Sequence, residues 1–182
     1  MKLTDGQIKA ILNRPATEFE IKPYPVKIEG IAVDLTLADG FRFMIASDEP
    51  IDLQSGVIEE AYGPLIHVQE KGIVIEPGDF LLGITAETVK IPKHMVGILD
   101  GKSTLARLGL CVHVTAGRID PGWNGNIVLE FFNAGKRSLL LRPGMKIAAI
   151  SFENLGRNVD IGYGDRLDAR YTAQHVTQGA KC

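Results

Sequence analysis

Gly125–Asn133, GNIVLEFFN, is the stretch that decides which kind of fold this sequence can form. Successive side chains of a strand point to opposite faces, and here both faces are largely apolar. One face would carry Ile127, Leu129 and Phe131, and the other Val128, Glu130 and Phe132. A strand that is apolar on both faces is covered on both sides, so the stretch predicts a buried strand in a sheet-rich fold.

Short apolar or alternating runs on either side of this stretch predict further strands. The clearest is Ile31–Leu37, IAVDLTL, whose alternation is typical of a half-buried strand. The other runs are FRFMI at 41–45, GIVIEPGDFLLGIT at 72–85, HMVGILD at 94–100 and RSLLLRPGMKIAAISF at 137–152. Glycine, proline, asparagine and aspartate separate them, and many short strands with frequent turn signals indicate a mostly β sandwich or barrel.

Two local patterns refine the expected fold: a short N-terminal helix and a repeated turn. Thr4 followed by Gln7 forms a capping-box pattern, apolar residues then recur at helical spacing, and Pro15 ends the run. Pro77-Gly78 and Pro143-Gly144 each lie between two apolar runs, which favours type II turns. Such turns are common, so the similarity of the two segments is equally compatible with chance.

The composition excludes several classes of function. The chain has 182 residues, of which 45% are hydrophobic, and a formal net charge of −2. We expect one domain over residues 1–182, with a polar, mobile tail from about residue 156. The charge is too low for a nucleic-acid-binding surface, and no apolar run of about 18 residues predicts a membrane helix. Cys111 and Cys182 are expected to be reduced thiols, which indicates a cytoplasmic protein.

Gly101–Leu110, GKSTLARLGL, resembles a phosphate-binding P-loop but does not have the spacing of that motif. The pattern G-x-x-x-x-G-K-[ST] needs a glycine one residue earlier than Gly97. The bulky Ile98 and Leu99 also lie where such a loop must curl its amides around phosphate. The chain lacks the alternation of strands and helices that a P-loop fold requires, so the sequence does not predict an NTPase.

The same segment still predicts a short helical turn. Ser103 is expected to cap a short helical turn over Leu105–Leu108, which Gly109 ends. A helix N-terminus can hold an anion in any fold, and Lys102 and Arg107 add positive charge. A surface helix with solvated basic side chains explains the pattern equally well.

The histidines and cysteines do not form a zinc-binding pattern. The four histidines, His67, His94, His113 and His175, lie in neither an H-x-E nor an H-E-x-x-H motif, and no C-x-x-C occurs. A zinc site like that of the zinc-dependent deaminases is therefore excluded. Cys111 lies in an apolar run and is expected to be a buried small hydrophobe.

Glu130 is the residue that does not fit its strand. Burial among apolar neighbours disfavours the charged form of a carboxyl and raises its pKa, which makes it a better general base. Two structural explanations remain open beside this one: Glu130 pairs with an arginine, or it blunts an exposed sheet edge.

The run at 99–135, LDGKSTLARLGLCVHVTAGRIDPGWNGNIVLEFFNAG, resembles the core of the dCTP deaminases, the zinc-independent branch of the trimeric dUTPase superfamily. The resemblance is weaker in TDGQIKAIL, in GIAVDLTL and in the tyrosine-bearing tail. It implies a mainly β fold, a distorted jelly-roll-like β-barrel of the dUTPase type with a short N-terminal helix and a few short helices. It also implies a cytoplasmic enzyme that hydrolyses dCTP to dUTP and ammonia during synthesis of dUMP and dTTP.

The resemblance further implies roles for individual residues. Glu130 would be the general base, and Ser103 and Arg107 would reach it from a neighbouring subunit of a homotrimer, where Arg107 would fix its charge state. Lys102, Ser103 and Thr104 would hold the triphosphate, and Arg107 would also contact phosphate. The remaining substrate-binding residues would be Val114, Ala116, Arg118, Asp120, Val128, Tyr163, Arg170 and Gln174.

Within this set, the resemblance implies a particular contact for most members. Asp120 would accept a hydrogen bond from the deoxyribose 3′-OH. Backbone groups near Val114 to Ala116 and Val128 to Glu130 would bind the pyrimidine edge, and the tail residues would close over the nucleotide. Mg²⁺ would arrive with the triphosphate without a dedicated protein site, and dTTP would act as a feedback inhibitor.

Three alternatives stay open. Gly117 is typical of bifunctional forms that continue to dUMP and pyrophosphate, whereas Arg118 and Trp123 are typical of forms that stop at dUTP. A plain dUTPase would leave Glu130 and Arg107 unexplained. A non-catalytic trimeric nucleotide-binding relative would not need the complete set of Glu130, Ser103 and Arg107.

Overall fold

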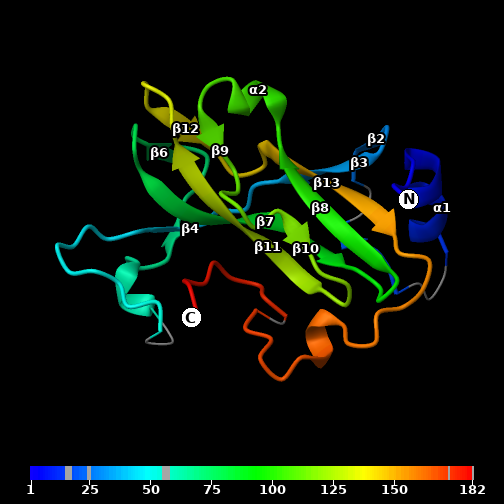
Figure 1. Ribbon diagram of the computed structural model, residues 1–182. Coiled ribbons are helices and arrows are strands. Elements are labelled where there is room, and N and C mark those ends of the chain that lie inside the picture. Colours follow the sequence, from blue (N-terminus) through cyan, green and yellow to red (C-terminus); the bar gives the residue numbers. More distant parts are fainter. Residues whose placement is uncertain (15–17, 24–25, 55–57, 172, 182) are drawn as a thin grey trace.

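The computed structural model describes residues 1–14, 18–23, 26–54, 58–171 and 173–181, so Pro15 and Cys182 lie outside the described residues. The chain is mainly β with a few short helices, as the sequence predicts (Figure 1). The helices are α1 (Asp5–Leu12), α2 (Ser103–Ala106) and the 3₁₀ turns η1 (Glu59–Ala61) and η2 (Tyr163–Asp165). The strands are β1 (Glu20–Lys22), β2 (Ile28–Glu29), β3 (Ala32–Thr36), β4 (Gly40–Phe43), β5 (Ile66–His67), β6 (Ile73–Ile75), β7 (Phe80–Lys90), β8 (Met95–Gly101), β9 (Leu110–Cys111), β10 (Arg118–Ile119), β11 (Asn124–Asn133), β12 (Leu139–Leu141) and β13 (Lys146–Asn154).

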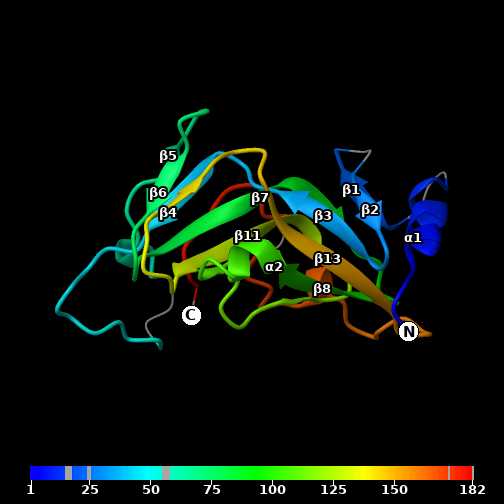
Figure 2. The same ribbon diagram turned by 90° about the horizontal axis from the view of Figure 1, so that it is seen from above.

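Two antiparallel sheets build the molecule. One runs in the order β5-β4-β7-β11-β9, with β1 also paired to β7, and the other runs β10-β8-β13-β3-β2. β6 and β12 form a separate two-stranded ribbon. The long pairs β7–β11 and β8–β13 cross the centre of the molecule (Figures 1 and 2).

A single hydrophobic core joins the two sheets. Leu35 and Ile150 enter it from one sheet, and Leu81, Leu129 and Phe131 enter it from the other, all with essentially no exposed surface. Each such side chain contributes about 1.5–3 kcal/mol when it leaves water. This burial fixes the register of β11, because a slip by one residue would turn its apolar face outward.

The strand that decides the fold, β11, is covered unequally on its two faces. Its burial alternates between fully buried residues such as Leu129 and half-buried ones such as Val128 and Glu130. The prediction of a covered strand is therefore confirmed, and the half-buried face is the one that lines a cavity.

The two local predictions outside the core are also confirmed. Thr4 caps α1, with the reciprocal hydrogen bonds of a capping box to Gln7. Gly78 and Gly144 have φ values of +89° and +80°. The amide of the following residue donates to the residue before the proline in both turns, at 3.0 and 3.2 Å, which is the type II geometry. β6 and β12, the strands that precede these turns, pair with each other.

The expected helix after β8 is wrong in its position. α2 spans Ser103–Ala106 and is preceded by Lys102 as N-cap, so Ser103 already has helical geometry and does not cap the turn. Lys102 keeps an extended backbone at φ −75° and ψ 126°, and its ammonium group pairs with Asp34 of β3. The strand conformation therefore persists through Lys102. None of the described helices is long and apolar enough to cross a membrane.

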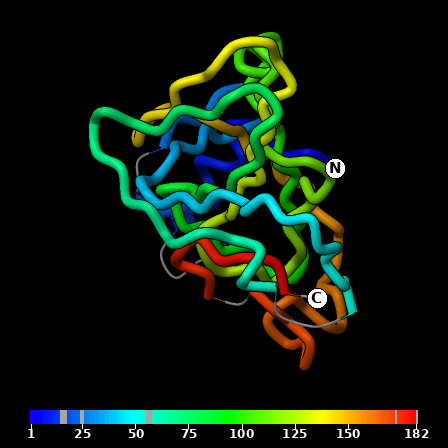
Figure 3. The backbone as a smooth tube through the Cα atoms, turned by 90° about the vertical axis from the view of Figure 1, so that its left-hand side faces the viewer, coloured from blue at the N-terminus to red at the C-terminus, as the bar shows by residue number. Residues whose placement is uncertain are grey.

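The chain after residue 155 turns back along the cavity side of the β7–β11 sheet. In Figure 3 its red segment runs beside the cyan and green part of the chain. Two hydrogen bonds fix its end, from Thr177 Oγ1 to the carbonyl of Gly40 at 2.9 Å and from the amide of Ile58 to the carbonyl of Ala180 at 3.2 Å.

Candidate active site

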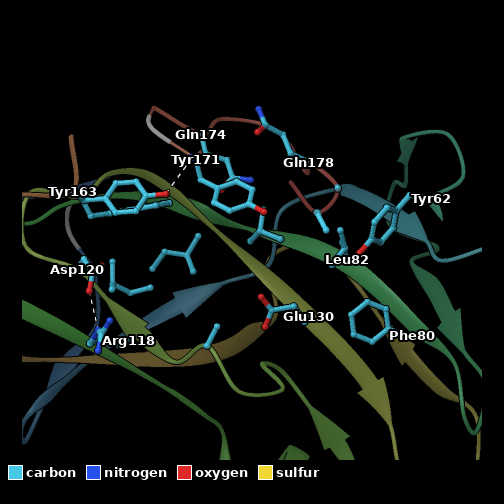
Figure 4. A pocket seen from close by; sticks show the side chains of 17 residues that line it. Tyr62, Phe80, Leu82, Arg118, Asp120, Glu130, Tyr163, Tyr171, Gln174 and Gln178 are labelled. Carbon is cyan, nitrogen blue, oxygen red and sulfur yellow. Dashed lines mark hydrogen bonds and ion pairs between the residues drawn. The ribbon is translucent and has the colours of Figure 1, made fainter. Parts of the chain in front are cut away.

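A cavity of about 370 Å³ lies between the half-buried face of β11 and the C-terminal tail (Figure 4). Val128 and Glu130 of β11 and Leu82 of β7 line one side of it. Tyr163, Tyr171 and Gln174 of the tail line the other side, while Arg118 and Asp120 lie at one end and Tyr62 and Phe80 at the opposite end. The cavity has the size of a small-molecule site, with a few polar groups in a largely apolar wall.

Glu130 lies against the apolar part of this wall, directly opposite Leu82 in the β7–β11 pair. Burial raises the pKa of the Glu130 carboxyl above its usual range, opposed in part by a hydrogen bond from the amide of Val114. That amide donates to Glu130 Oε2 at 3.4 Å. Among the described residues, no lysine or arginine of the same chain forms an ion pair with Glu130. The arginine-pairing alternative thus finds no support within one chain.

This raised pKa makes a prediction about stability. A carboxyl whose folded pKa lies above its unfolded value favours folding below the unfolded pKa, and that contribution is lost as pH rises through the folded pKa. The comparison is best made in an Arg107→Ala background, where only the chain's own surroundings act on Glu130. There, Glu130→Gln should raise the Tm by a few degrees at pH 8, with a difference that shrinks toward pH 4.5, the ordinary pKa of the carboxyl. A pH-independent Tm difference in calorimetry would contradict burial as the cause.

Asp120 organises the polar end of the cavity. Its carboxylate accepts a hydrogen bond from Arg118 Nε at 2.8 Å and pairs with Arg166 Nη1 at 3.1 Å. The guanidinium of Arg166 lies 5.6 Å from the centre of the Tyr163 ring, which itself packs 5.2 Å from the ring of Trp123. This end therefore offers a carboxylate acceptor beside two aromatic rings packed at an interplanar angle of 54°, a combination that suits a sugar hydroxyl.

The tail supplies a wall that is already bonded in place. The amide of Tyr171 donates to the hydroxyl of Tyr163 at 3.1 Å (Figure 4). The hydroxyl of Tyr171 in turn accepts from the amide of Lys181 at 3.0 Å. Gln174 is only 3% exposed, so its side chain is packed into this wall of the cavity.

Of the residues that the sequence predicts for the site, most gather at this cavity and some do not. Seven line it: Ala116, Arg118, Asp120, Val128, Glu130, Tyr163 and Gln174. Val114 lies beside it through its bond to Glu130. Five do not line it within one chain: Lys102, Ser103, Thr104, Arg107 and Arg170.

The residues that stay away from the cavity belong to two exposed segments. Ser103 and Arg107 belong to the exposed α2 turn, where Arg107 is the C-cap. Lys102 is engaged by Asp34, which also pairs with Lys146 at 3.3 Å. The guanidinium of Arg170 donates to the carbonyl of Lys181 on the outside of the tail. A single chain thus holds Glu130 and the tail but not the basic, hydroxyl-bearing α2 segment.

The residues at the apolar end of the cavity and the ion pair between Arg166 and Asp120 were not predicted from the sequence. Tyr62 comes from the segment after η1, and Phe80 and Leu82 come from β7, none of which carries a recognisable motif. The signal for Phe80 and Leu82 is their register opposite Phe132 and Glu130, which a single sequence does not reveal. Arg166, in the same tail as Tyr163, was not among the predicted residues.

Comparisons with known proteins show which family the sequence and the fold resemble. The model of the dCTP deaminase-like family matches residues 2–155. A crystal structure of 2′-deoxycytidine 5′-triphosphate deaminase from Agrobacterium tumefaciens has a similar fold, with a TM-score of 0.66 over 84% of this chain at 21% identity. The aligned part is 48% of the Agrobacterium chain, so this chain spans about half of that protein.

Two curated relatives align with this chain over nearly their whole length. The dCTP deaminase of Buchnera aphidicola is 46% identical over 96% of this chain and 95% of its own. The dCTP deaminase of a Marinomonas species is 43% identical over 100% of this chain and 97% of its own. The chain belongs to the dCTP deaminase family.

Proposed function

We propose that the protein is a zinc-independent dCTP deaminase, which hydrolyses dCTP to dUTP and ammonia in the cytoplasm and so supplies dUMP and dTTP synthesis. The observation that carries this proposal is Glu130, a carboxyl with a raised pKa that lines the cavity between β11 and the tail. Asp120 at the polar end of the same cavity supplies the group expected for a deoxyribose. The full-length likeness to dCTP deaminases gives the reaction its substrate.

The two ends of the cavity define how the nucleoside would lie. In cytidine the sugar is attached to N1, which lies opposite C4 across the ring. With the 3′-OH donating to Asp120, the ring would extend along Val128 toward Glu130. Its polar edge would then face backbone groups near Ala116 and Val128. The carbon to be attacked would lie at the carboxyl that can activate water.

The chemistry then needs one base and fixed donors. Glu130 takes a proton from water, and the resulting hydroxide attacks C4 to give a tetrahedral intermediate. Glu130 passes this proton to N3 of the ring. It then takes the proton of the new C4 hydroxyl and delivers it to the amino nitrogen, so that the C4–N bond breaks, ammonia leaves and the C4 carbonyl of uracil forms. The amide of Val114 holds the carboxylate in position through its 3.4 Å contact with Oε2. Exclusion of water strengthens each of these interactions.

A neighbouring copy of the chain would complete the site. Ser103 and Arg107 lie on an exposed turn away from the cavity of their own chain. We assign them to the Glu130 of the next subunit in a homotrimer, where Arg107 would set the charge of the carboxyl and Ser103 would help to position the water. Lys102 and Thr104 of the same turn would hold the triphosphate there, with Lys102 shared between phosphate and Asp34.

Magnesium would enter with the nucleotide. Among the described residues, no group of three or more histidine, cysteine, aspartate or glutamate side chains lies close enough to hold a metal ion. The expected Mg²⁺ ion needs no such group of side chains, because it would keep several waters and bind phosphate oxygens. When bound, it would neutralise charge on the triphosphate, while the reaction at C4 stays with Glu130 and its neighbours.

The tail from about residue 156 would close the site during turnover. Tyr163 and Gln174 already line the cavity, and Arg170 would turn from the carbonyl of Lys181 toward the triphosphate. Movement of such a segment shields the reaction from water and releases the product. Binding of dTTP in the same cavity would provide feedback inhibition.

A bifunctional enzyme that continues to dUMP and pyrophosphate is the second candidate. Gly117 favours it, because a Cβ at this position would lie 3.0 Å from both His113 Cε1 and the carbonyl of Leu99. The histidine expected of a single-function enzyme therefore does not fit here without movement. Arg118, bonded to Asp120, retains the single-function pattern. A non-catalytic nucleotide-binding relative is the third candidate.

Product analysis separates these candidates. Incubated with dCTP and Mg²⁺, the protein should release ammonia and form dUTP in equal amounts, measured by an ammonia assay and anion-exchange chromatography. Ammonia together with dUMP and pyrophosphate would establish the bifunctional enzyme instead. Hydrolysis of added dUTP without any turnover of dCTP would refute the deaminase.

A further inference from the structure

One residue of β11, Asn126, ties the catalytic strand to β7 and to the tail. Its side-chain amide donates to the carbonyls of Thr85 at 2.8 Å and Ala86 at 3.3 Å. Its Oδ1 lies 3.2 Å from His175 Nδ1, and its backbone amide donates to the carbonyl of Gln174 at 2.8 Å. Three segments that are far apart in sequence therefore meet at one side chain and its backbone.

Asn126 also lies at an irregularity in the strand. The pairing of β11 with β7 shifts register between Asn126 and Val128, and such bulges re-aim the side chains that follow them. The shift is held by the buried Thr85, whose hydroxyl accepts from the amide of Ile127 at 2.9 Å. The residues after the shift, Val128 and Glu130, are those that line the cavity. The interactions that hold the bulge therefore also set the positions of Val128 and Glu130.

The tail passes the bulge at close range. A Cβ at Gly125, the neighbour of Asn126, would lie 2.8 Å from the carbonyl oxygen and 2.9 Å from the amide nitrogen of Gln174. Gly125 also has a φ of +151°, a conformation that favours glycine. Backbone-to-backbone contact here leaves no room for a side chain, so the position of Gln174 is set directly by the bulge.

We propose that Asn126 is a positioning residue, which holds the C-terminal tail in register with the catalytic strand through Gln174 and His175. Gln174 lines the cavity and is almost fully buried, so a fixed bulge aligns one wall of the substrate site with the other. A tail held to the strand in this way has less ordering to undergo when substrate binds. For its effect on catalysis, this proposal rests on the proposed function.

The test compares Asn126→Ala and His175→Ala with Asn124→Ala, a matched control at an exposed position of the same strand. The alanine at position 126 keeps the backbone bond to Gln174 but loses the side-chain bonds to β7 and His175. Their loss should loosen the tail and raise the KM for dCTP about tenfold, with a much smaller change in kcat. Trypsin should also release the peptide after the exposed Arg170 faster than in the wild type, followed by intact mass. His175→Ala should change both in the same direction by less, and Asn124→Ala should change neither.

The two readouts separate the possible failures. Wild-type KM and wild-type cleavage in both Asn126→Ala and His175→Ala would overturn the proposal. Faster cleavage with an unchanged KM would show a docked tail that does not position the substrate, which also overturns it. If the wild type does not turn over dCTP, the proposed function fails, and the cleavage rates still decide the docking. His175→Ala changes an exposed tail residue, so it gives a decision even where Asn126→Ala lowers the Tm.

Discussion

Replacement of Glu130 by glutamine is expected to reduce the turnover of dCTP by at least about a thousandfold, because general acid–base catalysis by a positioned group contributes up to about 10⁴-fold. Glutamine has nearly the same shape and keeps an oxygen that can accept from the amide of Val114. It cannot take a proton from water. Nucleotide binding should therefore persist, with a dissociation constant for dCTP within about threefold of the wild-type value by calorimetry.

Asp120→Asn provides the matched control for this variant. It keeps the shape of the side chain at the polar end of the cavity and removes the negative charge that pairs with Arg118 and Arg166. It should raise the KM while leaving Glu130 able to act. Substantial activity in Glu130→Gln would mean that the base is another group. Loss of nucleotide binding in that variant would mean that Glu130 has a structural role.

The second large effect is expected when two inactive variants are combined. Arg107→Ala should lower kcat by about a hundredfold or more, because it removes a fixed charge from the site. If Arg107 serves the Glu130 of a neighbouring chain, co-expression of Arg107→Ala with Glu130→Gln should restore activity. In randomly mixed trimers, about a quarter of the sites would receive an intact Glu130 from one chain and an intact Arg107 from the next.

The control replaces the first partner with the double variant. Glu130→Gln co-expressed with a chain that carries both Arg107→Ala and Glu130→Gln has no intact Glu130, so it should remain inactive. Purification through different tags on the two chains ensures that mixed oligomers are assayed. Absence of recovered activity in tagged mixed trimers would place Arg107 and Glu130 in one chain or remove Arg107 from the site.

The sequence predicted the parts of this molecule that depend on local pattern. The alternation in β11, the capping box at Thr4 and the Pro-Gly turns each depend on a few neighbouring residues, and the structure confirms all three. Glu130 was found because a carboxylate in an apolar strand is a local conflict. Its raised pKa follows from the same conflict.

The features that the sequence did not predict depend on contacts between segments that lie far apart in the chain. The start of α2 was misplaced because Lys102 is held extended beside Asp34, which lies in another strand. Tyr62 and Phe80 reach the cavity only through strand pairing and a loop that carries no motif. Asn126 has no feature in the sequence that marks it. Only the folded chain brings its partners Thr85 and His175 together.

The most direct test of the central claim, that this cavity activates water for attack at C4 of dCTP, is turnover in ¹⁸O-labelled water followed by mass spectrometry of the nucleotide. We expect one ¹⁸O atom on the uracil ring of each dUTP formed and none in its phosphates. Label on the ring together with label on the phosphate of dUMP or on pyrophosphate would identify the bifunctional enzyme. A product with no label on the ring would mean that the cavity does not activate water for attack at C4.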